Sequence, residues 1–149
     1  MGQEPRISIA AFERICREEA PFFQLYGFDV REIGFGRARV GMHADEHHIR
    51  PGGTISGPAQ MALADFALYG AVLGAIGDVP LAVTTNLSVN FLNRPKVGGL
   101  SAESKIIKHG KRLMVGEVWI YSDGEEEDEP LLVAHVTGTY SVPPAKSEG

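Results

Sequence analysis

The stretch PAQMALADFALYGAVLGAI, residues 58–76, decides how this chain folds. It is long enough for about five helical turns and is apolar on nearly all sides, with Gln60, Asp65 and Tyr69 as its main polar interruptions. A helix of this kind is surrounded either by protein or by lipid. Because a charged Asp near the middle of a membrane span costs about 2.5–3.5 kcal/mol, we expect a helix wrapped by a curved sheet and no membrane segment.

Signals for both ends of this helix flank the stretch. Ser56 is placed to cap the first turn, and Pro58 suits the first helical positions, where a missing N–H costs nothing. Gly77 follows the last apolar residue and is a typical C-terminal stop. The sequence therefore predicts a helix that begins just after Ser56 and ends at Gly77.

The rest of the chain predicts one α+β domain over residues 1–149. A short amphipathic helix capped by Ser8 is expected at about 8–20, and the tail after about 143 is expected to fray. Short connections between the later strands favour antiparallel pairing. Strands are predicted over 27–42 (two strands around a turn at Ile33-Gly34), 82–92, 100–108, 112–122 and 131–142.

Strict alternation over 82–92 predicts which side chains share a face. One face would carry Val83, Thr85, Leu87, Val89 and Phe91. Thr84 would then lie on the other face, with Asn86, Ser88 and Asn90.

Composition narrows the class of protein. The net charge of -5 lacks the basic footprint of a nucleic-acid-binding protein, so no nucleic acid partner is expected. The single cysteine, Cys16, excludes an internal disulfide and suits a buried structural thiol. No secretory signal is visible before the first helix, and we expect a cytoplasmic protein.

Asp65 is the strongest candidate for chemistry. The chain has no P-loop, no G-x-G-x-x-G after a strand and no G-x-S-x-G, and its His43–His48 run matches no metal-ligand spacing, which predicts a surface loop. A carboxylate on an apolar helix needs a partner or a proton. Asp65 could act as a general base, or it could bond a neighbouring strand or mark a subunit interface.

The segment that leads into the helix adds an oxygen-binding element. Unpaired N–H groups at a helix start carry partial positive charge and can receive a thioester carbonyl or an oxyanion. Gly57 would let a ligand approach the backbone closely. Asp65 lies eight residues further on, roughly 10–12 Å along the helix, which leaves room for a thioester and a water.

These residues resemble the phenylacetic-acid-degradation (PaaI-like) type of hotdog-fold acyl-CoA thioesterase. The family pattern G-x-x-H-G-G, four residues, then L-A-D is similar to GGTISGPAQMALAD, and similarity continues through residues 83–113 and LLVAHVTGTYSV to about residue 143. This chain departs from the pattern at three positions. Ser56 replaces the His, Pro58 replaces the second Gly, and Arg50 stands where an Asn is frequent.

The resemblance implies a long helix wrapped by an antiparallel sheet of five to six strands. It also implies homodimers or homotetramers with active sites at the subunit interface. Asp65 would be general base or nucleophile, the Gly57 amide would polarise the thioester carbonyl, Ser56 could bond a carbonyl, and Thr84 of the partner subunit, or else Thr85, would position water. Candidate contacts for the phosphates of coenzyme A are Arg94, Lys96, Lys111 and Arg112, with a solvated surface charge as the alternative for each. Arg50 is a further candidate substrate-binding residue. Coenzyme A is part of the substrate, so no separate cofactor and no metal are expected.

Three other functions stay open at this point. The changes at Ser56 and Pro58 suit an acyl-CoA or lipid-binding protein without turnover. A hotdog enoyl-CoA hydratase would need a His beside Asp65, and His48 could approach it only through the fold. In an interaction module, Asp65 would merely fix an interface. The sequence does not specify the acyl group, the pathway, or dimer against tetramer.

Overall fold

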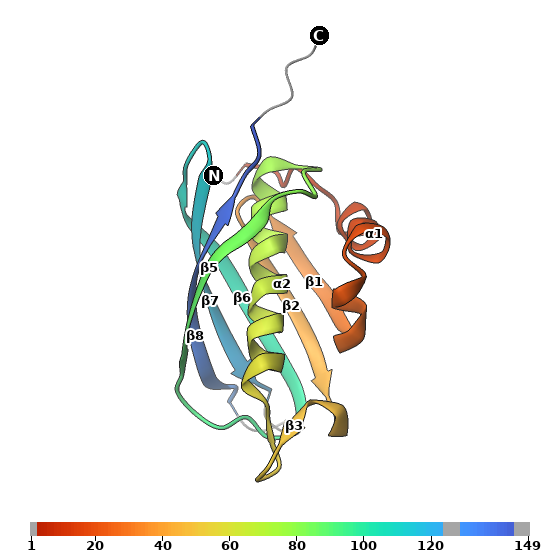
Figure 1. Ribbon diagram of the computed structural model, residues 1–149, viewed down its shortest axis with the longest axis vertical. Helices are drawn as coiled ribbons and strands as arrows, with labels where there is room; N and C mark the ends of the chain where they lie inside the picture. The colour runs from red at the N-terminus through yellow and green to blue at the C-terminus, as the bar shows by residue number, and fades with distance from the viewer. Residues whose placement is uncertain (1–2, 124–128, 145–149) are drawn as a thin grey trace.

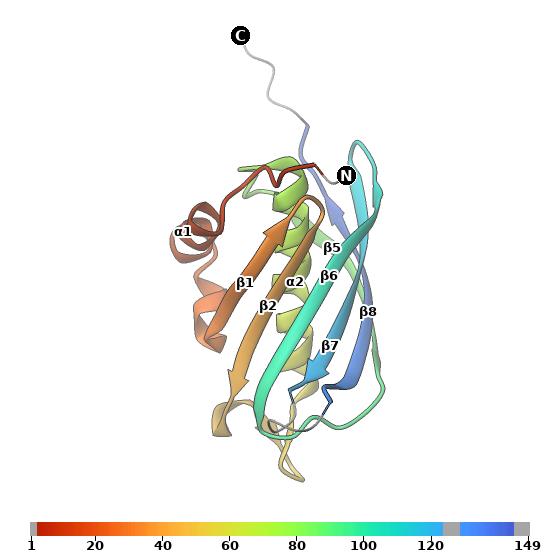
Figure 2. The ribbon, with the colours of Figure 1, turned by 180° about the vertical axis from the view of Figure 1, so that it is seen from behind.

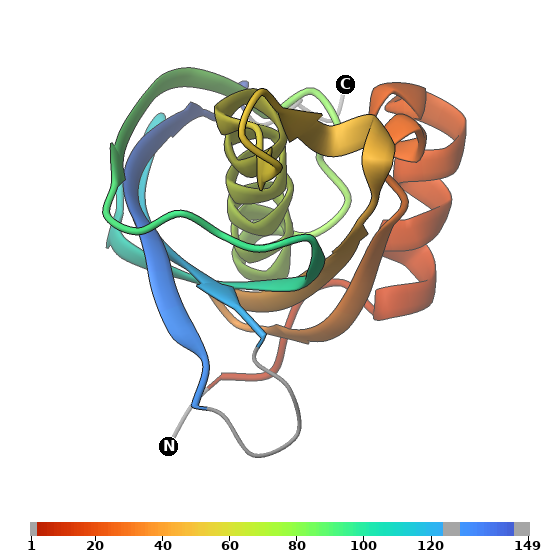
Figure 3. The same cartoon turned by 90° about the horizontal axis from the view of Figure 1, so that it is seen from below.

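The computed structural model describes residues 3–123 and 129–144. At its centre lies the long helix α2, Gly57–Ile76, and a six-stranded antiparallel sheet curves around it (Figure 1). The view along the helix shows how the sheet wraps it (Figure 3). The strands are β1 Phe28–Gly34, β2 Arg37–Ala44, β5 Val83–Phe91, β6 Gly98–His109, β7 Leu113–Ser122 and β8 Leu131–Ser141.

The strand order is β1-β2-β6-β7-β8-β5, which places β1 and β5 at opposite edges of the sheet. From behind, helix α1, Ile9–Glu19, lies beside the β1 edge (Figure 2). A 3-10 helix, η1 Pro21–Tyr26, links α1 to β1. The long helix and the antiparallel sheet are therefore confirmed as expected.

The caps predicted for the two helices are confirmed. Ser8 Oγ accepts a hydrogen bond from Ala11 N at 3.1 Å, and Ser56 Oγ accepts one from Ala59 N at 3.3 Å. Gly77, with a φ of 90°, ends α2 and donates its N–H to Leu73 O. Although α2 is long and apolar enough to cross a membrane, 83% of its most apolar window is buried inside the fold, as expected of a core helix.

Three local predictions need correction. The β1–β2 hairpin turns at Phe35–Gly36 rather than at Ile33-Gly34, because Gly36 takes the positive φ of 68° that the turn requires. The His43–His48 run, predicted as a surface loop, contains the end of β2 and the 3-10 helix η2 Glu46–His48. Strand β3 Ile49–Arg50 follows it and pairs with β4 Thr54–Ile55. The helix η1 was not expected. Of the tail predicted to fray, residues 145–149 lie outside the described residues.

Strand β5 does not alternate simply. Thr84 pairs with Tyr140, yet Asn86 pairs with Thr139, so Thr85 is an extra residue that forms a β-bulge. The bulge shifts the phase of the strand, and Thr84 therefore faces α2 together with Leu87 and Val89, which pack against the core. The predicted faces are wrong for the residues before the bulge.

Candidate active site

Asp65 lies at a half-buried position of helix α2, most of whose residues are buried. Its Oδ1 accepts two hydrogen bonds, from Thr84 Oγ1 at 2.5 Å and from Tyr140 Oη at 2.6 Å. Among the residues that the structure describes, none donates a hydrogen bond to Oδ2. One carboxylate oxygen is thus fixed by the protein, and the other is free to meet a ligand.

The sheet brings the two hydroxyl groups together. Thr84 on β5 and Tyr140 on β8 are opposite each other in the antiparallel register, and opposite side chains share one face of a sheet. Both belong to one chain with Asp65. Thr84 thus bonds Asp65 within one chain, because the bulge turns it toward the helix of its own chain. The role of Thr84 from a partner subunit in positioning water stays a prediction.

Tyr140 is a site residue that the sequence interpretation missed, since its position suited the apolar face of the last strand. Its side chain is only 2% exposed, and its ring stacks on Tyr69 with centroids 5.9 Å apart. Burial, and then the nearby Asp65 carboxylate, raise the pKa of Tyr140 well above its usual value of about 10. The phenol therefore stays protonated and can act as a donor. The available signal was a polar hydroxyl on a strand face that is otherwise apolar.

The start of α2 borders the same edge of the sheet. A Cβ on Gly57 would come within 3.2 Å of the Phe91 ring, at the end of β5, so the glycine allows this close contact. Ser56 has its hydroxyl occupied by the Ala59 N–H, which gives it a capping role. Gln60, in the first turn, is buried; its Nε2 donates to Ile55 O at 3.3 Å, while no described group bonds its Oε1.

The remaining predicted contacts do not gather in one chain. Thr84, not its alternate Thr85, faces Asp65, because the exposed Thr85 hydroxyl donates to Thr139 O at 3.3 Å. Arg50 pairs with Thr54, which bridges to Lys96, so these two cations lie near each other. Exposed Arg94 lies in the same connection as Lys96.

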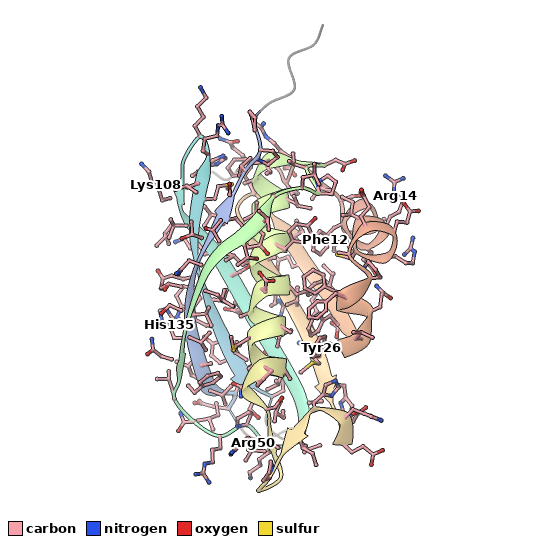
Figure 4. The ribbon with its side chains drawn as sticks, viewed as in Figure 1. Phe12, Arg14, Tyr26, Arg50, Lys108 and His135 are labelled. Atoms are coloured by element: carbon pink, nitrogen blue, oxygen red, sulfur yellow. The ribbon has the colours of Figure 1, made fainter. Side chains whose placement is uncertain are left out.

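Lys111 and Arg112 occupy the β6–β7 turn, at the other end of β6 from Lys96. Figure 4 shows this separation through Arg50 at one end of the molecule and Lys108 at the other. A single chain therefore offers two groups of cations rather than one.

The histidine-rich run has a local structural role. Asp45 caps η2 through a hydrogen bond from His47 N at 2.9 Å, and its own N–H donates to His48 Nδ1 at 3.1 Å. His48 also stacks near Tyr26. Over residues 3–123 and 129–144, no group of three or more His, Cys, Asp or Glu side chains is arranged to hold a metal ion.

The sequence profile of the thioesterase superfamily matches residues 52–129. The chain belongs to this superfamily. Helix α2, including Gly57 and Asp65, falls within the matched segment. The fold is the hotdog fold of thioesterases, with its long helix packed against a curved antiparallel sheet.

Individual relatives of this thioesterase-superfamily chain agree with the match. A protein of Silicibacter sp. TM1040 described as a candidate thioesterase is 36% identical, and the match covers 97% of each chain with a TM-score of 0.80. A mutant of the phenylacetic acid degradation protein PaaI from Thermus thermophilus is 26% identical over 83% of this chain and 99% of that one, with a TM-score of 0.71. A candidate esterase of Saccharolobus solfataricus is 29% identical over 93% of this chain and 87% of its own length. These homologues indicate a hydrolase.

Proposed function

We propose that this protein hydrolyses the thioester of an acyl-CoA and that Asp65 is the catalytic carboxylate. The observation that carries the proposal is the arrangement at Asp65, a half-buried carboxylate on the core helix whose Oδ1 is fixed by Thr84 and Tyr140 and whose Oδ2 is free. A fixed carboxylate with one available oxygen can accept a proton from water or attack a carbonyl carbon.

The proposed reaction begins with a thioester carbonyl that accepts a hydrogen bond from the Gly57 N–H. This amide lies at the positive end of α2, where it can stabilise the developing oxyanion. Asp65 Oδ2 takes a proton from a water molecule as that water attacks the carbonyl carbon. The tetrahedral intermediate then collapses with cleavage of the C–S bond, and the proton held by Asp65 goes to the departing thiolate of coenzyme A.

The spacing of the two groups favours the general-base role. Eight residues of helix separate Gly57 from Asp65, a rise of about 12 Å. A thioester and a water fit between them, whereas direct attack needs reacting atoms within about 3–3.5 Å. A nucleophilic Asp65 would therefore need its carbonyl held by Gly57 of a second copy.

The proposed assembly is a homodimer, and two such dimers would pair into a homotetramer. Within the described residues, β5 has a neighbouring strand on one side only, and exposed Val83, Phe91 and Leu92 lie along or next to it. A free nine-residue edge with apolar side chains is a template for pairing with another strand. Because Thr84 and Phe91 belong to this edge strand, the proposed site borders the proposed interface.

Two alternative functions, a hydratase and a non-catalytic acyl-CoA binder, predict different results in an assay of thiol release. A hydratase is disfavoured because the described hydrogen-bond partners of the Asp65 side chain are Thr84 and Tyr140, with no His among them. A non-catalytic acyl-CoA binder is favoured by the departures from the family pattern at Ser56, whose Oγ caps the helix, and at Pro58. A binder would retain acyl-CoA without releasing thiol.

The test is the release of free coenzyme A from short, medium, long and aromatic acyl-CoA esters by the wild type and by Asp65→Asn. We expect wild-type turnover and a loss of kcat of about 10²–10⁴-fold in the variant, with unchanged circular dichroism. Full turnover by Asp65→Asn would contradict the mechanism. Binding of the esters without thiol release by the wild type would instead support the binder.

A further inference from the structure

The phenol of Tyr140 is placed where it can decide which oxygen of Asp65 reacts. We propose that Tyr140 is a positioning residue: with Thr84, it holds Asp65 Oδ1 and thereby presents Oδ2 to the substrate. This inference rests on the proposed function of Asp65. It adds a role for a residue of the last strand that lies 75 positions from Asp65 in the sequence.

The number of available protons supports this assignment. A tyrosine hydroxyl has one proton to donate, and Tyr140 Oη lies 2.6 Å from Asp65 Oδ1 but 3.2 Å from the Asp65 backbone oxygen. The shorter contact to a charged acceptor is the stronger hydrogen bond. Thr84 supplies a second proton to the same Oδ1 at 2.5 Å. Two donors occupy Oδ1, and Oδ2 keeps its lone pairs for the reaction.

The surroundings of Tyr140 make it a rigid support. Strand β8 lies between β7 and β5, and the Tyr140 ring is 2% exposed. It stacks at 23° on the ring of Tyr69. A donor fixed by the core costs no reorganisation when the substrate binds. Thr84 alone is a weaker support, because it lies on the edge strand.

Tyr140→Phe is the direct test, and Tyr69→Phe is its matched control. Both substitutions remove one hydroxyl from the same stacked pair of rings, but only the first removes a hydrogen bond to Asp65. We expect Tyr140→Phe to lower kcat by about 10- to 100-fold, with little change in KM, since the carboxylate loses its orientation while the ligand-binding surface is kept. Tyr69→Phe should keep the wild-type kcat.

Equal kcat in Tyr140→Phe and the wild type would overturn the inference, and so would an equal loss in both Phe variants. If thiol release still depends on Asp65 in that case, the proposed function stands without it. A wild type that releases no thiol from any ester would be a failure of the proposed function itself.

If Tyr140→Phe does not fold, NMR of the wild type and of Asp65→Asn tests the inference without that variant. NMR of protein labelled with ¹³C at the tyrosine Cζ can follow the hydroxyl protons of Tyr140 and Tyr69. The Tyr140 hydroxyl signal should be protected from exchange and should shift strongly in Asp65→Asn, whereas the Tyr69 signal should not move. A Tyr140 hydroxyl signal insensitive to Asp65→Asn would overturn the inference independently of any activity.

Discussion

Thr84 and Tyr140 face each other across β5 and β8, and both hydroxyls donate to the same oxygen of one helix carboxylate. Through these two hydrogen bonds, Asp65 Oδ1 connects helix α2 to the edge strand β5 and to the interior strand β8. A disturbance of either strand would therefore be transmitted to Asp65. The predictions below separate this local chemistry from the stability of the fold.

The methyl and hydroxyl groups of Thr84 should have separable effects. Thr84→Val keeps the shape of the side chain but removes the donor to Asp65 Oδ1, so kcat should fall by about 10- to 100-fold. Thr84→Ser retains the hydroxyl and should recover most of that loss. Thr137→Val, an exposed change on β8, is the control. Steady-state thiol release measures all three, and a Thr84→Ser as slow as Thr84→Val would count against a role for the hydroxyl.

Loss of the Ser56 cap should destabilise the protein. Ser56→Ala removes the acceptor for Ala59 N, and a lost N-cap costs about 1 kcal/mol. Ser8→Ala removes the corresponding acceptor at the start of α1 and provides a matched change far from Asp65. Urea unfolding gives both free energies. A Ser56→Ala protein as stable as the wild type would show that the cap contributes little at this helix start.

The Cys16 thiol should be unreactive in the folded protein. Burial, and then the nearby Glu13, raise the pKa of Cys16 to about 12, so at pH 8 only about one thiol in 10,000 is ionised. We expect slow reaction with a disulfide reagent such as DTNB in buffer and rapid release of one equivalent in denaturing urea. Rapid labelling of the native protein at pH 8 would show that the site is open.

Alkaline pH should unfold the protein through its buried tyrosines. Burial raises the pKa of both Tyr69 and Tyr140, so above pH 10 the unfolded chain releases phenolic protons that the folded chain retains. The free energy of unfolding contributed by each tyrosine is present below pH 10 and is lost at about 1.4 kcal/mol per pH unit above it. Urea unfolding between pH 9 and 11 should show a shallower decline in a Tyr69→Phe, Tyr140→Phe double variant. Parallel declines in the two proteins would refute this account.

Much of the fold could be predicted because its signals are local. The helix stretch, its caps at Ser56 and Gly77 and the late strands follow from hydrophobic pattern and capping chemistry. Asp65 was predicted because a carboxylate on an apolar helix is costly without a partner. The partners themselves depend on tertiary structure.

Nothing near Tyr140 in the sequence indicates that its hydroxyl donates a hydrogen bond to Asp65. A period-two pattern likewise cannot locate a bulge at Thr85. The separation of Lys96 from Lys111, by contrast, follows from the sequence pattern, since the two residues flank one predicted strand.

The extra residue at Thr85 makes β5 two half-strands of opposite parity joined at one point. A regular strand of the same length would place Thr84 and Leu87, which are three residues apart, on opposite faces and would force a choice. Either the Thr84 hydroxyl keeps its carboxylate and the apolar half of the strand turns to solvent, or that half stays inside and the hydroxyl turns away. The irregularity at Thr85 is therefore what allows one strand to present a hydroxyl to the helix carboxylate and apolar side chains to the core on the same face.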